Sequence, residues 1–179
     1  MKAKRRTLTV KWIVYILYFL LLFTLQQTPG ALPVIMGVRP SLLLPAVVCV
    51  ALYDHELFGA VFGIIAGVLW DLNSISRPFG YSALLLMAIG CLCGLLVTFF
   101  MRNNFFTALL LTIPAIAVYE GLTWFIFTFL MGEPDSVGIL LHYTLPRAVY
   151  SLAVMPILYA IQFLLHRCFR KRLISAEEV

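Results

Sequence analysis

Charged residues are scarce in this sequence, and most of them lie at its two ends. Of its 179 residues, 12% are charged and 63% are hydrophobic, and the mean hydropathy is +1.00. Basic residues cluster in residues 2–11 and 167–172. Between these ends there is no polar stretch long enough for a water-soluble domain. We therefore predict one domain, residues 1–179, that folds in lipid. Because the net charge of +5 sits beside apolar segments, we expect contact with anionic membrane lipids and no nucleic-acid partner.

The sequence also lacks the residue patterns of enzymes and metal sites. It contains no Ser/His/Asp pattern, no phosphate-binding glycine loop and no metal-ligand spacing. Of its four cysteines, Cys49, Cys91 and Cys93 lie inside apolar runs, which favours buried reduced thiols over a disulfide or a zinc site. We predict a protein that is not an enzyme, with no catalytic residue, no cofactor and no metal.

What the sequence does contain is a series of six apolar segments separated by turn signals. We predict membrane-spanning helices at residues 8–25, 31–53, 56–72, 79–101, 105–131 and 137–165. The first segment lacks a signal-peptide cleavage pattern and is read as a retained helix. Prolines interrupt the second, so we expect a bent or re-entrant segment whose regular helix begins near Ser41. The third is short for a span and should be buried among other helices.

The basic clusters at both ends predict the orientation of the bundle. Positively charged flanks stay on the cytoplasmic side of a membrane. An even number of spans returns the chain to the side on which it started. We predict a multi-pass membrane protein with both termini in the cytoplasm.

Three glycines recur at every fourth position of the third segment: Gly59, Gly63 and Gly67. A stripe of small residues lets the backbone of a neighbouring helix approach closely in lipid. One interpretation is ordinary packing inside the bundle, since Gly90 and Gly94 repeat the spacing on the fourth segment. The other is a groove that receives the helix of a partner protein.

Glu120 and Arg147 are the charges farthest from the segment ends. They lie at similar distances before and after the turn at Pro134, so antiparallel helices place them at similar depth. We predict an intramembrane ion pair that fixes the register of this hairpin. A polar cavity for a ligand or a proton is the alternative, with four further polar side chains nearby: Tyr119, His142, Tyr143 and Tyr150.

Asp71 stands at the end of the third segment, where the helix dipole disfavours an acid. A basic partner would compensate. Arg39 enters the second segment from the same side, so we predict an Arg39–Asp71 ion pair, with Arg77 as the reserve partner. The alternative is that these charges are solvated at the level of the lipid headgroups.

The middle of the chain carries an ordered set of motifs. They are Arg39-Pro40-Ser41-Leu42-Leu43-Leu44, Glu56-Leu57-Phe58-Gly59, Gly63, Gly67-Val68-Leu69-Trp70-Asp71 and Pro78-Phe79-Gly80-Tyr81-Ser82-Ala83-Leu84. In this order the motifs resemble those of the bacterial rod shape-determining protein MreD family. Pro146-Arg147 and Tyr150 also fit.

The resemblance implies a non-enzymatic scaffold of the cell-elongation (rod) complex, located in the bacterial cytoplasmic (inner) membrane. Such a scaffold binds MreC and links MreB filaments to a RodA-type polymerase and a class B penicillin-binding protein, and so to peptidoglycan synthesis and cell shape. It also implies a six-helix bundle resembling the substrate-binding component of energy-coupling-factor transporters. We expect the glycine stripe, or the groove beside the broken second segment, to bind the single transmembrane helix of MreC. The alternative function is the substrate-binding membrane subunit of a vitamin or metal transporter.

Overall fold

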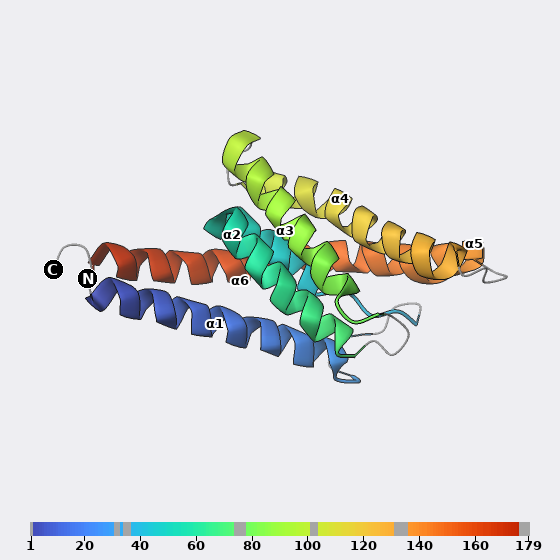
Figure 1. Ribbon diagram of the computed structural model, residues 1–179, viewed down its shortest axis with the longest axis horizontal. Coiled ribbons are helices and arrows are strands. Elements are labelled where there is room, and N and C mark those ends of the chain that lie inside the picture. The colour runs from blue at the N-terminus through green and yellow to red at the C-terminus, as the bar shows by residue number, and fades with distance from the viewer. Residues whose placement is uncertain are drawn as a thin grey trace.

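A computed structural model describes residues 2–30, 33, 37–73, 78–100, 104–130 and 136–175, and its regular elements are helices. They are α1 (Lys2–Gln27), α2 (Leu43–Asp71), α3 (Tyr81–Phe100), α4 (Phe105–Trp124), η1 (Phe125–Phe129), α5 (Ser136–Ile139), η2 (Leu140–Thr144) and α6 (Leu145–Ser175) (Figure 1). Among the described residues, four stretches are long and apolar enough to cross a membrane: Thr9–Gln27, Tyr81–Phe99, Phe105–Phe129 and Val137–Phe169. The prediction of an all-helical membrane protein is confirmed at this level.

Helix α2 covers the later part of the second predicted segment and nearly all of the third. Its backbone is helical throughout, but a Cβ atom added at Gly59 would lie 2.6 Å from the Cβ atom of Ala51. Residues eight positions apart in a straight helix are separated by about 12 Å along its axis. The helix therefore folds back on itself near Asp54–Glu56. We call Leu43–Asp54 the first arm and residues 56–71 the second arm.

The first arm covers residues 43–53 of the predicted span at residues 31–53. Regular helix begins only at Leu43, close to the expected start at Ser41. Pro45 falls in the first turn, where the backbone N–H that proline lacks has no helical acceptor. At ~1.5 Å per residue the first arm is ~18 Å long, which is shorter than the ~30 Å apolar layer of a bilayer.

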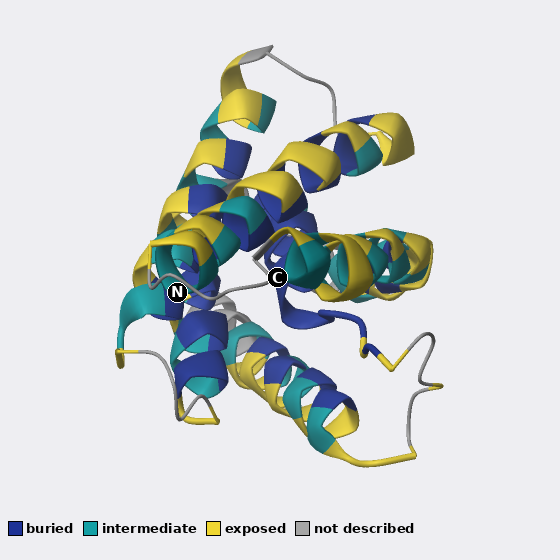
Figure 2. Cartoon of the chain, turned by 90° about the vertical axis from the view of Figure 1, so that its right-hand side faces the viewer, coloured by how far each residue is buried: buried dark blue, intermediate teal, exposed yellow. Residues whose placement is uncertain are grey.

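The centre of the molecule is built around this short arm. Every residue from Pro40 to Leu52 is buried, and Figure 2 shows the buried segments at the middle with the exposed ones outside. A helix enclosed on all sides must be apolar all round. This explains why the first arm shows no polar face in the sequence.

The second arm of α2 and α3 form the closest helix pair. A Cβ atom at Gly63 would lie 2.4 Å from the carbonyl oxygen of Leu86, and one at Gly67 would lie 2.2 Å from the Cα atom of Ala83. Gly59 meets the carbonyl of Gly90 in the same way, at 2.6 Å. The glycine stripe is thus covered by α3. This geometry agrees with the packing interpretation and leaves no open groove along the stripe for the helix of a partner.

Both ends of the chain lie at the same end of the bundle. The first turns of α1 and the last turns of α6 lie together in Figure 1. We call this the terminal end, and the opposite one the distal end. The distal end holds the end of α1, the start of α3 and the two π-helical segments η1 and η2.

Candidate functional site

The predicted charges Glu120 and Arg147 meet near the distal end. Arg147 Nε lies 3.4 Å from Glu120 Oε1, and the two side chains are 24% and 8% exposed. The guanidinium carbon of Arg147 also lies 5.0 Å from the centre of the Trp70 ring. The structure therefore brings α4, α6 and the second arm of α2 together around one cation. At 3.4 Å the contact is longer than a strong charge-assisted hydrogen bond, so the guanidinium keeps donor capacity.

Asp71 does not pair with Arg39, and this prediction is corrected. The Asp71 carboxylate accepts backbone N–H groups from Gly80 at 2.8 Å, Ser82 at 3.3 Å and Ala83 at 3.4 Å. These groups begin α3, where the first N–H groups of a helix have no partner of their own. Gly80, at φ +99°, provides no capping side chain, so Asp71 does so from another helix. The acid that is unfavourable at the end of α2 is compensated by the positive end of α3. Arg77, the reserve partner, lies outside the described residues.

Arg39 belongs to a non-helical entry segment, residues 37–42. Its Nη1 lies 3.4 Å from the carbonyl oxygen of Gln27 and donates to it. The buried N–H of Ser41 donates to Ser151 Oγ at 2.7 Å, and that of Leu42 donates to Gln26 Oε1 at 2.9 Å. Irregular backbone is tolerated at membrane depth only where protein groups bind it. Side chains of α1 and α6 thus hold the entry segment inside the bundle and hold Arg39 at the distal end.

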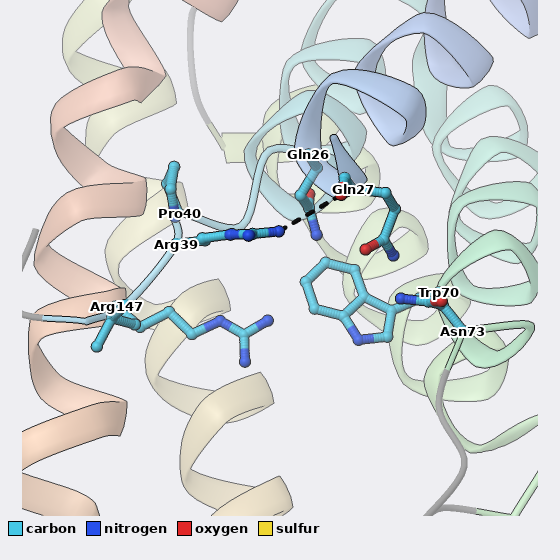
Figure 3. A pocket seen from close by; sticks show the side chains of 8 residues that line it. Gln26, Gln27, Arg39, Pro40, Trp70, Asn73 and Arg147 are labelled. Carbon is cyan, nitrogen blue, oxygen red and sulfur yellow. Dashed lines mark hydrogen bonds between the residues drawn. The ribbon is translucent and has the colours of Figure 1, made fainter. Parts of the chain in front are cut away.

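These elements enclose two adjoining hollows that share Val38 and Arg147. The first has a volume of about 260 Å³ and is lined by Gln26, Gln27, Val38, Arg39, Pro40, Trp70, Asn73 and Arg147. Both arginines border it, with the indole of Trp70 across from them (Figure 3). The second has a volume of about 240 Å³, and both π-helical segments line it. We call the two together the distal cavity.

The other polar side chains expected here fall into two groups. Tyr143 lines the second hollow, whereas His142 is exposed and does not line it. The Tyr119 hydroxyl donates to Ser82 Oγ at 3.1 Å, and the Tyr150 hydroxyl donates to the carbonyl of Pro33 at 2.9 Å. Tyr119 therefore connects α4 to α3, and Tyr150 connects α6 to the chain at Pro33.

A second polar cluster, at the terminal end, was missed by the sequence analysis. Asp54, whose side chain is 3% exposed, accepts a hydrogen bond from Lys11 Nζ, and its Oδ1 lies 3.3 Å from His166 Nδ1. The cluster joins α1, α6 and the reversal of α2. The feature of the sequence that could have indicated this cluster is Asp54, an acid between two apolar runs. It was expected on the same side of the membrane as both basic ends of the chain. Among the described residues, no three His, Cys, Asp or Glu side chains are grouped to hold a metal ion.

Helices suited to crossing a bilayer, with an ion pair and a polar cavity between them, define a helical membrane protein. A family model described as rod shape-determining protein MreD matches residues 5–169, and the chain belongs to this family. Membership implies a role in determining rod shape. No curated protein and no solved structure matches the chain.

Proposed function

We propose that the chain is a non-enzymatic scaffold in the bacterial inner membrane that binds the transmembrane helix of MreC. Through MreC it would link MreB filaments to the RodA-type polymerase and the class B penicillin-binding protein. Family membership supports the role in cell shape. The fold supports a scaffold because the backbones of α2 and α3 pack directly against each other at the glycines. Such close packing would give a partner protein a surface of fixed shape.

The surface that we assign to MreC is an apolar groove on the lipid side of this pair. The groove has a volume of about 520 Å³ and is lined by Ile64, Pro78, Phe79, Gly80, Tyr81, Ala83, Leu84 and Met87. Phe79 and Leu84 are 68% and 66% exposed. Helices in lipid associate by van der Waals packing, so an apolar groove between two rigid helices is suited to a single transmembrane helix. The groove replaces the glycine stripe, which α3 already covers.

The test is co-purification with MreC after the groove is filled. We expect Leu84→Trp to abolish recovery of MreC with the detergent-extracted protein, because the larger ring occupies the space of the partner helix. Leu110→Trp is the matched control, since Leu110 is 55% exposed on α4, away from the groove. Equal recovery of MreC with both variants would show that the partner helix binds elsewhere.

The distal cavity supports a second candidate function, the substrate-binding subunit of a vitamin or metal transporter. Glu120 and Arg147 would contact the substrate. We propose in addition that the chain shares the six-helix fold of the substrate-binding components of energy-coupling-factor transporters, as expected from the sequence resemblance. This similarity of fold would support the second function. Neighbouring genes separate the two functions: MreB and MreC genes favour the scaffold, and a gene for a coupling ATPase favours transport.

A further inference from the structure

We propose that the distal cavity binds the phosphate-bearing headgroup of an anionic membrane lipid, with Arg39 and Arg147 as its cationic ligands. The charge of the lining supports an anion. Of the described residues that line the two hollows, two are arginines and one is a glutamate, which leaves one positive charge in excess. The guanidinium fork matches the oxygen atoms of a phosphate better than an ammonium group does.

The neutral groups around the arginines also suit an anion. The first hollow is bordered by the side-chain amides of Gln26, Gln27 and Asn73, and each of them carries N–H donors. Figure 3 shows both guanidinium groups beside the same space. None of the described residues that line this hollow is an acid. Glu120, the acid of the second hollow, lies 3.4 Å from Arg147 Nε and does not line the first hollow, whereas Arg147 lines both.

A buried hydroxyl supplies an independent observation. Thr123 lines the second hollow and is 5% exposed, and its Oγ1 atom has no hydrogen-bond partner. The Nε atom of Arg147 is likewise buried without a hydrogen bond of normal geometry. Buried polar atoms are costly unless they are paired. A headgroup oxygen in the cavity would pair with both atoms.

The shape of the second hollow favours a lipid over a soluble anion. The hollow lies between η1 and η2, where Ile139 and Tyr143 form part of its wall. Tyr143 is 59% exposed, so this wall is open to the surroundings of the bundle. Single π-helical turns inside α-helices are frequent at functional sites, and here two of them border one cavity. The headgroup would lie at the arginines, and the acyl chains would leave through the open wall and extend along the bundle toward the membrane centre.

The experiment measures lipid binding to the full chain in a neutral maltoside detergent by native mass spectrometry. The probes are dioleoyl phosphatidylglycerol, dioleoylglycerol with the same chains and no phosphate, and glycerol 3-phosphate with no chains. We expect one phosphatidylglycerol molecule per chain and no retained dioleoylglycerol. Equal retention of dioleoylglycerol would overturn the proposal, because apolar contacts with the acyl chains would then account for lipid binding without the phosphate. Binding of glycerol 3-phosphate as tight as that of the lipid would overturn the lipid assignment.

Variants locate the bound lipid. Arg39→Gln should weaken binding about tenfold, the loss expected for a charge-assisted contact. Thr123→Val should weaken it by a smaller factor, because the lost hydrogen bond is neutral. Arg167→Gln, on an exposed arginine at the terminal end, is the matched control and should bind as the unmodified chain does. Glu120→Gln should strengthen binding by removing the negative charge, a change that misfolding does not produce. Equal affinity in all four variants would overturn the proposal.

Discussion

Several polar side chains of this bundle bind backbone groups rather than each other. Gln26 and Ser151 accept N–H groups of the entry segment, and Asp71 accepts three N–H groups at the start of α3. Lipid offers no alternative partner for an exposed backbone group, so each of these contacts replaces water. Buried polar residues at the distal end are therefore explained first by the irregular backbone that they stabilise.

Replacement of Asp71 tests this role. We expect Asp71→Ala to lower the unfolding free energy by about 0.5–2 kcal/mol, the usual cost of losing a helix cap. Asp71→Asn should recover most of the stability, because the amide oxygen still accepts the N–H groups. The measurement is the midpoint of thermal unfolding in detergent.

The same pair of variants separates a cap from an ion pair. If Asp71 were held by a cation such as Arg39, asparagine would be as harmful as alanine. Arg39→Gln would then lower the midpoint to the same extent. We expect Arg39→Gln to leave the midpoint nearly unchanged, since Arg39 is exposed and its hydrogen bond to Gln27 is 3.4 Å long.

Charged pairs across a hairpin could be predicted from the sequence, whereas side chain–backbone contacts could not. Glu120 and Arg147 were placed together because the turn between their helices fixes their relative depth. Asp71 was assigned to Arg39 because an acid at the end of a helix calls for a positive partner. Its actual partners are N–H groups, which every residue but proline carries, so no residue type marks them in a sequence.

At the scale of helices, the α2–α3 contact should tolerate no side chain at Gly63. A Cβ atom there would lie 2.4 Å from the backbone of Leu86, and backbone cannot rotate aside as a side chain does. We expect Gly63→Leu to destabilise the protein by about 1–3 kcal/mol or to prevent folding. Fluorescence-detected size-exclusion chromatography after a series of heating steps gives the measurement.

Gly121→Leu provides the control for this substitution. A Cβ atom at Gly121 would have no neighbour within 4 Å, although Gly121 also lies inside a long helix. Leucine favours helix more than glycine does, so this variant should be as stable as the unmodified chain or more so. Equal damage from both substitutions would mean that helix propensity or lipid contact, and not the approach of α3, decides the effect.

The reversal of α2 shows how far periodicity and composition can predict an element. The polar run Asp54-His55-Glu56 correctly marked a break between two apolar segments. It did not show that the first arm would be short and wholly buried, because an apolar run looks the same against lipid and against protein. The prolines at 40 and 45 set the start of the helix, and only the contacts of Gln26 and Ser151 show how the preceding chain is accommodated.

At the scale of the whole molecule, the charged side chains that contact one another lie at the two ends of a largely apolar centre. The terminal end holds Lys11, Asp54 and His166, and the distal end holds Arg39, Glu120, Arg147 and the cavity between them. Aqueous and headgroup zones lie at both faces of a bilayer, so this distribution matches a bundle that stands across it. The terminal end carries the basic residues of both chain ends, which the positive-inside rule assigns to the cytoplasm.

The chain carries its own reporter for this orientation. Cys168 is exposed on α6 near the terminal end, whereas Cys49 and Cys93 are buried and Cys91 is half-buried. A membrane-impermeant maleimide should therefore leave intact cells' protein unlabelled and should label Cys168 once the inner membrane is opened. In the matched variant, Cys168→Ser combined with Asn73→Cys, the thiol moves to the exposed distal position 73, and intact spheroplasts should be labelled. Labelling of Cys168 in intact spheroplasts would place the terminal end outside and would reverse the orientation that we propose for the scaffold, because the basic ends would then face away from MreB.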